Sequence, residues 1–182
     1  MTNQKLQGKK ILMVIARKDF RDEEYFIPKK IFEDNGAETK TASSKTGAIL
    51  GFLGGETEAD INIKDIKAEN FDAVVFVGGN GAQEYFDDEE AHRVIKEFHD
   101  AGKTIGAICI APVILAKTSV LKNKKATVWQ SPTDKTGPKI LEQAGCSVST
   151  SNIEKSDNII TANGREASEE FAKTIMEELA RR

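Results

Sequence analysis

Cys109 lies in a sequence context that is typical of a catalytic nucleophile. It directly follows the apolar run 104–108 and precedes a helix predicted to begin near Ala111, and small residues, Ala107 and Ala111, flank it two positions away. Small residues at these positions leave room for the sharp strand-to-helix turn of a nucleophile elbow, which exposes the side chain. A helix N-terminus beside the sulfur favours a thiolate, so we expect a lowered pKa for Cys109.

The second cysteine, Cys146, has no such context. It follows Gly145 and opens a short predicted strand, so we interpret it as a small buried hydrophobic residue, as an isolated cysteine usually is. That interpretation is also the alternative for Cys109, where the position between strand and helix favours the catalytic one. With two cysteines, two histidines and no CxxC pair, the chain offers no obvious metal-ligand set, and we expect no metal.

Few other groups are candidates to assist the thiol. A glycine turn, GGNG at 78–81, follows a predicted buried strand. Backbone N–H groups of Gly79 and Ile110 are the candidate oxyanion donors. Asn80 and Trp129 are candidates to line a pocket, although Trp129 is equally compatible with covering the sheet. No G-x-G-x-x-G follows the first strand, so we expect no dinucleotide cofactor.

The two histidines offer little support for a Cys–His pair. His92 and His99 are seven residues apart and share one face of the helix predicted at 87–101. Helical spacing alone is weak evidence, so they are interpreted as exposed or half-buried helix residues. The sequence shows no Cys–His pair of the kind used in hydrolysis.

The predicted elements place Cys109 and the glycine turn at strand ends. Near-continuous apolar runs predict buried parallel strands, and amphipathic segments that end at glycine predict helices. Strands are expected at 10–16, 37–42, 71–77, 104–108, 125–129 and 158–162, with another beginning at Cys146. Helices are expected at 23–35 (with Pro28 in its first turn), 87–101, 112–117 and 166–179, with another ending at Gly145. The alternation predicts an α/β fold with a mostly parallel sheet between helical layers.

The composition is that of an ordinary globular protein. The chain has 182 residues, 39% of them hydrophobic and 30% charged, with a net charge of -3. This length fits a single domain, 1–182. A net negative charge gives no indication of binding to nucleic acid or to an anionic membrane. The first ten residues lack an apolar signal segment, so we expect a cytoplasmic protein.

Four segments in the expected order resemble the ThiJ/PfpI superfamily. AICIAP at 107–112 is similar to its AIC-x-G/A-P signature, and VGGNGAQ at 77–83 to its glycine turn. EYFIP at 24–28 and NIITANG at 158–164 resemble its E-x-x-x-P segment and its last strand. The resemblance implies a three-layer sandwich with a flavodoxin-like sheet, as in class I glutamine amidotransferases. It is strongest to the Parkinson's-disease protein deglycase branch and extends to PfpI-type intracellular proteases.

The resemblance also assigns a role to Glu24. It matches the acidic residue that contacts the cysteine sulfur in the family, usually as a protonated hydrogen-bond donor. Burial beside a thiolate would raise the pKa of such a carboxyl. On the sequence alone, the polar run RDEE at 21–24 favours a solvated charge instead. The chain departs from the family at the histidine: PfpI-type proteases have it where this chain has Ile110, and the deglycase branch where it has Trp129.

Three functions follow from these observations. The first is a stress-related enzyme of glyoxalase or deglycase type, in which Cys109 and Glu24 act on a small reactive carbonyl or on its adduct with a protein. The second is a redox-responsive protein or chaperone whose Cys109 is oxidised to a sulfinate. The third is a PfpI-type protease or amidase, which the missing histidine disfavours. The family generally associates, and the Gly-rich segment 47–55, a hairpin or an exposed apolar flap, predicts a homodimer or higher homo-oligomer.

Overall fold

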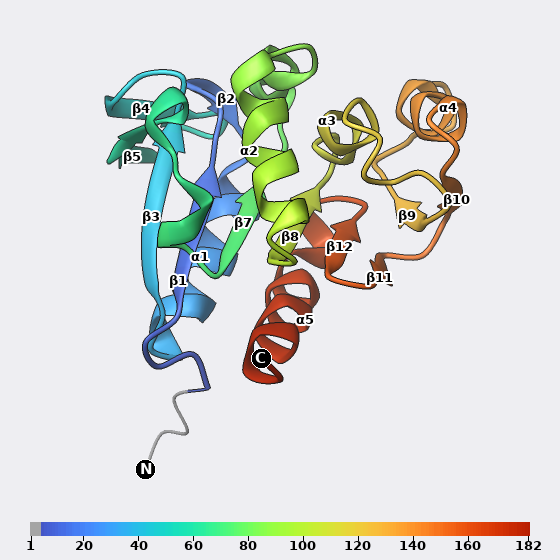
Figure 1. Ribbon diagram of the computed structural model, residues 1–182. Helices are drawn as coiled ribbons and strands as arrows, with labels where there is room; N and C mark the ends of the chain where they lie inside the picture. The colour runs from blue at the N-terminus through green and yellow to red at the C-terminus, as the bar shows by residue number, and fades with distance from the viewer. Residues whose placement is uncertain (1–4) are drawn as a thin grey trace.

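The structure, a computed structural model, describes residues 5–182, and a seven-stranded sheet forms its centre. The strands are β1 Lys10–Val14, β3 Glu38–Ser43, β6 Ile61–Asn62, β7 Ala73–Phe76, β8 Thr104–Ile108, β11 Ile153–Ser156 and β12 Ile159–Ala162. They lie in the order β11-β12-β8-β7-β1-β3-β6, and only β11 with β12 is antiparallel (Figure 1). The five inner strands have the chain order 2-1-3-4-5, which is the flavodoxin-like arrangement. The predicted fold class is confirmed.

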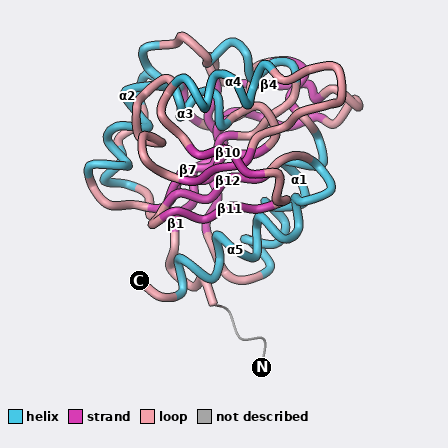
Figure 2. Tube along the Cα trace, turned by 90° about the vertical axis from the view of Figure 1, so that its right-hand side faces the viewer, coloured by secondary structure: helices cyan, strands magenta, loops and turns pink. Residues whose placement is uncertain are grey.

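Helices cover both faces of this sheet, and Figure 2 shows the strands between them. α1 Asp22–Asp34 and α5 Ser168–Ala180 pack together on one face, while α2 Glu89–Asp100 and α3 Pro112–Ala116 pack on the other. A small parallel sheet of β9 Lys125–Thr127 and β10 Ser147–Ser149 lies beside α4 Thr136–Gln143. Short 3-10 turns occupy Ile63–Asp65, Ala68–Asn70, Asn80–Tyr85 and Arg165–Ala167.

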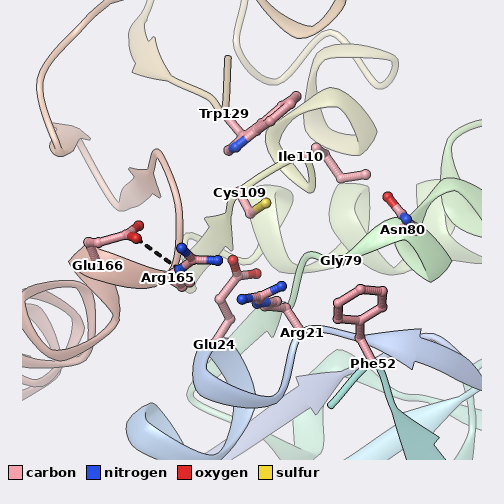
Figure 3. Close-up of a pocket in the computed structure, with 10 residues that line it drawn as sticks. All are labelled: Arg21, Glu24, Phe52, Gly79, Asn80, Cys109, Ile110, Trp129, Arg165 and Glu166. Carbon is pink, nitrogen blue, oxygen red and sulfur yellow. Dashed lines mark hydrogen bonds and ion pairs between the residues drawn. The ribbon is translucent and has the colours of Figure 1, made fainter. Parts of the chain in front are cut away.

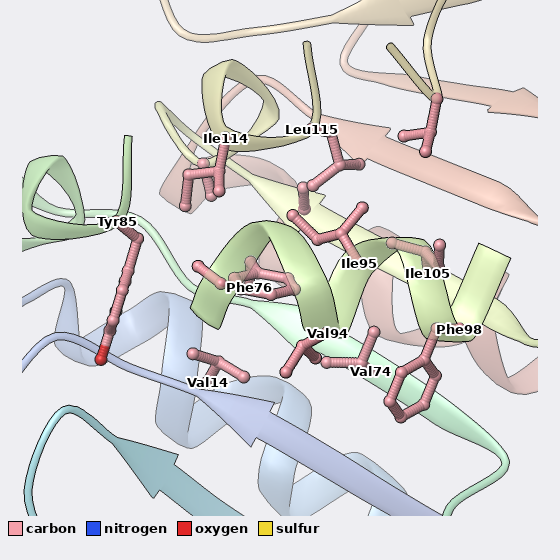
Figure 4. Packing of buried hydrophobic residues seen from close by; sticks show 14 of the residues in the cluster. Val14, Val74, Phe76, Tyr85, Val94, Ile95, Phe98, Ile105, Ile114 and Leu115 are labelled. Carbon is pink, nitrogen blue, oxygen red and sulfur yellow. The ribbon is translucent and has the colours of Figure 1, made fainter. Parts of the chain in front are cut away.

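The hydrophobic core is divided by the sheet into two clusters. Along β1, Leu12 and Val14 pack with α2, whereas Ile11 and Met13 pack with α1 and α5. Figure 4 shows the α2 side, where Val14 lies near Val94. Alternate residues of a strand point to opposite faces, and both faces are covered here, so the inner strands are apolar at nearly every position.

The Gly-rich segment 47–55 belongs to a hairpin with an exposed apolar tip. β4 Gly47–Gly51 pairs antiparallel with β5 Glu56–Ala59, and β2 Lys18–Phe20 adds to β4. Leu50, Phe52 and Leu53 are 46%, 53% and 60% exposed. Both interpretations of the segment therefore hold in part, and self-association through it stays a prediction.

Pro28 is not in the first turn of its helix, so that expectation is wrong. It is the seventh residue of α1 and lies buried inside the helix. Proline has no N–H to donate to the carbonyl four residues earlier, which is that of Glu24. The helix nevertheless continues to Asp34, because its inner face packs on β1, β3 and α5. Within residues 5–182, none of the helices combines the length and the apolar character needed to cross a membrane.

Candidate active site

A cavity of about 330 Å³ opens at the carboxyl ends of the central strands, where α/β sheets usually bind ligands. Cys109 directly follows β8, Gly78 and Gly79 follow β7, and Glu24 lies in the first turn of α1. The lining residues, drawn in Figure 3, are Arg21, Glu24, Phe52, Gly79, Asn80, Cys109, Ile110, Trp129, Arg165 and Glu166.

Cys109 has the backbone conformation of a nucleophile elbow. Its φ of 64° lies in the left-handed region, which costs a non-glycine residue roughly 1–2 kcal/mol. Two hydrogen bonds hold the strained residue: its N–H donates to Ala162 O at 2.9 Å, and its carbonyl accepts from Trp129 N at 2.8 Å. Ala107 and Ala111 are fully buried, as the small-residue pattern requires. The backbone on both sides of the elbow therefore fixes the direction of the thiol.

Glu24 is buried beside this thiol rather than solvated. Its side chain is 1% exposed, and its Oε2 accepts a hydrogen bond from Gly78 N at 3.1 Å. Burial raises the pKa of Glu24 from 4.5 to about 7, while hydrogen bonds with the Cys109 thiol and with Gly78 N–H partly oppose the rise. The carboxyl is therefore close to half protonated at neutral pH.

Gly78 allows the carboxyl and the thiol to approach each other. A Cβ on Gly78 would lie 2.5 Å from both the Cβ of Cys109 and the Oε2 of Glu24. Gly79 adopts a φ of 97°, and a Cβ there would meet the backbone N of Arg21 at 2.5 Å. The glycine turn is thus required by close packing as well as by conformation.

The expected lowering of the Cys109 pKa is wrong for the resting site. Burial is the largest effect, and together with the negative charge of Glu24 it raises the pKa of Cys109 to about 12. Hydrogen bonds from the N–H groups of Gly79 and Ile110 lower it, but by less. α3 is only five residues long, so desolvation of the sulfur outweighs the helix terminus. The thiol is a neutral group facing a carboxyl that can accept its proton.

The structure separates the predicted pocket residues from the histidines. Asn80 and Trp129 line the cavity, together with the backbone donors described above. His92 lies on α2 with its Nε2 2.9 Å from Phe86 O, outside the cavity lining. His99 is half-buried beside Asp100 at the end of the same helix. Within residues 5–182, neither histidine belongs to the site.

Four lining residues were not predicted from the sequence: Arg21, Phe52, Arg165 and Glu166. Arg165 and Glu166 follow β12 closely, so the rule that sites lie beyond strand ends would have found them. Phe52 lies on the tip of the β4–β5 hairpin, and the Arg21 guanidinium lies 5.5 Å from its ring centre. No local signal placed that tip over the cavity.

Asp22 holds the hairpin tip against the start of α1. Its two carboxylate oxygens accept hydrogen bonds from Leu53 N and Gly55 N, both at 2.7 Å, and its side chain is nearly buried. Phe52 N also donates to Phe20 O at 2.9 Å. These contacts bring Phe52 to the wall of the cavity.

Comparisons with known proteins agree with this fold and order of motifs. The family model described as the DJ-1/PfpI family matches residues 9–178. An uncharacterised protein of Methanocaldococcus jannaschii is 36% identical over 172 residues, which cover 94% of this chain and 82% of that protein. The protein named Deglycase PfpI from Pyrococcus furiosus is 28% identical over 118 residues, or 65% of this chain and 71% of that protein.

A solved structure of a family member has the same fold. The crystal structure of a ThiJ/PfpI domain protein from Brachyspira murdochii superimposes with a TM-score of 0.90 at 35% identity, covering 96% of this chain and 99% of that chain. The family match spans the glycine turn after β7, the elbow after β8 and the strand before α5. Because the family model matches nearly the whole length of this chain, the chain belongs to the DJ-1/PfpI family.

Proposed function

We propose that the chain is a cysteine-dependent enzyme that acts on small reactive carbonyl compounds. The observation that carries the proposal is the pairing of the Cys109 thiol with the buried carboxyl of Glu24 inside a cavity of about 330 Å³. A cavity of this size is at the small end of ligand sites, which suits an α-oxoaldehyde such as methylglyoxal. Archaeal relatives named deglycases support the same class of chemistry.

In the first step, the sulfur of Cys109 bonds to the aldehyde carbon and the C=O π electrons move to the oxygen. The thiol proton passes to the ionised Glu24 carboxyl and from there to the new alkoxide, which gives a neutral hemithioacetal. Because the thiol itself is hard to ionise, a base at contact distance is what makes it nucleophilic. The N–H groups of Gly79 and Ile110, which hydrogen-bond the sulfur, stabilise negative charge at this position.

Turnover then needs only proton transfers and one water molecule. Moving a proton from the hemithioacetal carbon to the neighbouring carbonyl carbon, through an enediol, converts the adduct to a 2-hydroxy thioester. Water hydrolyses the thioester to a 2-hydroxy acid and restores the thiol, so no external oxidant is required. Glu24 is placed to move these protons, because a carboxyl with a pKa of about 7 can both give and take one near neutral pH.

The same geometry disfavours peptide hydrolysis. Cleavage of an amide requires a general acid for the departing amine, which contributes roughly 10²–10⁴-fold. Ile110 and Trp129 line the cavity at the positions where the family resemblance would have histidine, and neither side chain can act as a general acid at working pH. We therefore expect casein and fluorogenic peptides to be cleaved slowly or not at all.

Methylglyoxal turnover in matched variants tests the proposal. Cys109→Ser is expected to abolish formation of the hydroxy acid, and Glu24→Gln to lower kcat/KM by roughly 10²–10⁴-fold. His92→Ala is the control and is expected to keep the wild-type rate, since it lies outside the cavity lining. Wild-type turnover in Cys109→Ser would contradict the proposal. If methylglyoxal is untouched but mild peroxide adds two oxygen atoms to Cys109 by intact mass, the redox alternative holds instead.

A further inference from the structure

We propose that Arg21 and Arg165 form a carboxylate-binding subsite beside Cys109, so that carbonyl compounds that carry a carboxylate, the 2-oxo acids, also bind in the cavity. This inference goes beyond the proposed function and rests on it for the role of the thiol. A carboxylate beside the carbonyl carbon cannot accept the proton that moves during methylglyoxal turnover, so 2-oxo acids bind as reversible adducts of the thiol. The simplest member of the class is glyoxylate.

Arg21 offers its free end to the cavity. Its Nε and one terminal nitrogen donate to the two carboxylate oxygens of Glu23 at 2.9 and 3.2 Å. Phe52 packs 5.5 Å from the guanidinium, and the Arg21 backbone N donates to Gly78 O at 3.0 Å. The side edge of the guanidinium is thereby fixed, while its second terminal nitrogen has no hydrogen-bond partner within residues 5–182.

Arg165 repeats this arrangement from another element. It opens the short turn between β12 and α5, and its Nε donates to Glu166 Oε1 at 2.8 Å. Both of its terminal nitrogens are without a hydrogen-bond partner in the part of the chain that the structure describes. Figure 3 shows the two guanidinium groups on the same side of Cys109, next to the carboxyl of Glu24.

Two guanidinium groups with free terminal N–H groups bind a carboxylate more strongly than they bind a neutral group. A guanidinium binds a carboxylate through two parallel N–H···O bonds, and such charge-assisted bonds are roughly twice as strong as neutral ones. Glu23 and Glu166 offset much of the positive charge, so recognition depends on the directed N–H groups more than on net charge. Lysine in place of either arginine would therefore keep the positive charge but lose the pair of parallel N–H donors.

A 2-oxo acid bound in this way can add to the thiol of Cys109 without a further reagent. The sulfur of Cys109 bonds to the aldehyde carbon of glyoxylate, the thiol proton passes through Glu24 to the former carbonyl oxygen, and the carboxylate stays on the arginines. The product is a hemithioacetal, which forms without oxidant or reductant and reverses when free glyoxylate is removed.

A comparison of two alkylating reagents tests the subsite without requiring turnover. Iodoacetate and iodoacetamide form the same S–C bond and release iodide, and at pH 7 they differ only in the carboxylate. The rate ratio, iodoacetate over iodoacetamide, is measured at Cys109 by peptide mapping and compared with the ratio for free glutathione. Arg21→Gln, Arg165→Gln and Arg165→Lys are the test variants. Arg181→Gln, at the far end of α5, is the matched control.

We expect the ratio at Cys109 to exceed that of glutathione and to fall by about tenfold in Arg21→Gln and in Arg165→Gln, since tenfold corresponds to about 1.4 kcal/mol for the lost contact. Arg165→Lys should fall nearly as far and Arg181→Gln should not change. An unchanged midpoint of urea unfolding shows that each variant is folded, and the ratio cancels any change in the reactivity of the thiol that both reagents share. A ratio equal to that of glutathione, or one unaffected by either arginine variant, would overturn the subsite whether or not methylglyoxal is a substrate. Competition by glyoxylate, but not by acetaldehyde, should slow both reagents in the wild type.

Discussion

The two cysteines of this chain both have a raised pKa but entirely different surroundings. Burial raises the pKa of both thiols above the ordinary value. Cys109 follows the carboxyl end of a central strand, with a φ of 64° and the Glu24 carboxyl at its sulfur. Cys146 immediately precedes a short strand of the small sheet and is 7% exposed, with its sulfur 3.7 Å from the carbonyl of Ser147.

The difference shows that a raised pKa does not identify a site by itself. Both thiols are neutral at pH 7, yet only Cys109 faces a cavity and an ionisable group that can take its proton. The position on the fold supplies both: strand ends bring Glu24, Gly79 and Cys109 together from three separate segments. We therefore expect the reactivity of each thiol to depend on access and on a neighbouring base more than on the pKa of the isolated thiol.

The largest expected effect is on turnover. Cys109→Ala should reduce methylglyoxal turnover to the rate of buffer alone, whereas Cys146→Ala should keep most of the wild-type activity, because its thiol lies outside the cavity. Formation of the hydroxy acid measures both. Loss of activity in Cys146→Ala with an unchanged unfolding midpoint would show that the comparison between the two thiols is wrong.

The next effect is on alkylation of the two thiols in one sample. Iodoacetamide at pH 7 should modify Cys109 at least about tenfold faster than Cys146, since Cys109 is half-buried and lines a cavity while Cys146 is buried. Peptide mapping over time measures the two rates. In Glu24→Gln the rate at Cys109 should fall, because amide in place of carboxylate removes the base. Equal alkylation rates at the two cysteines in the wild type would show that access to the thiol does not decide its reactivity.

The sequence was sufficient for the inner strands and for the position of Cys109 at the end of one of them. The strand expected at 104–108 has those bounds in the structure, because burial on both faces leaves an apolar run that starts after Lys103 and reaches the turn at Cys109. The sequence did not predict how the short, half-exposed strands pair. β9 and β10 form their own sheet, and β11 pairs antiparallel at the edge, which tertiary contacts decide rather than local pattern.

For the site, the positions at strand ends were predictable and the electrostatics were not. Cys109 and Gly79 follow apolar strands, so their convergence was expected. The resemblance placed Glu24 at the sulfur, but burial of the sulfur itself is the largest cause of the raised Cys109 pKa. Burial arises from tertiary packing, which a local sequence pattern does not report. Phe52 reaches the cavity only because Asp22 holds a tip that is 31 residues away.

A third prediction concerns stability and pH. The pKa of Glu24 is raised from 4.5 to about 7, so the folded state holds a proton that the unfolded state has lost between these values. The free energy of unfolding should therefore decrease as pH rises through this window, by about 2–3 kcal/mol between pH 5 and pH 8 from this group. Glu24→Gln has no such proton, so its stability relative to the wild type should increase by that amount over the same range.

Urea unfolding of wild type and Glu24→Gln at several pH values measures the difference. Cys146→Ala is the matched control, because a thiol with a raised pKa does not titrate below pH 8 in either state. A difference between wild type and Glu24→Gln that stays constant from pH 5 to pH 8 would mean that the carboxyl is ionised throughout, as a solvated residue would be.

The smallest expected effect comes from adding one methyl group beside each cysteine. Gly78→Ala introduces a Cβ 2.5 Å from Cys109 Cβ and Glu24 Oε2, and overpacking of this kind costs roughly 1–3 kcal/mol. Gly145→Ala, next to Cys146, meets nothing nearer than Lys122 Cγ at 3.4 Å, but its φ of +80° costs an alanine roughly 1–2 kcal/mol. The two variants should therefore lose similar amounts of stability in urea unfolding.

Their activities should nevertheless differ, and that difference isolates the geometry of the site from the stability of the fold. At Gly78 the added methyl group has to push the thiol and the carboxyl apart, because the third neighbour, the Ile108 carbonyl at 2.8 Å, belongs to the central strand. Proton transfer between Cys109 and Glu24 depends on their contact, so methylglyoxal turnover should fall well beyond what the unfolded fraction explains. At Gly145 the strain is confined to a turn before the small sheet, and turnover per folded molecule should be unchanged. Equal specific activities in the two variants, at equal stability, would show that the approach of thiol and carboxyl is a packing feature without a role in the chemistry.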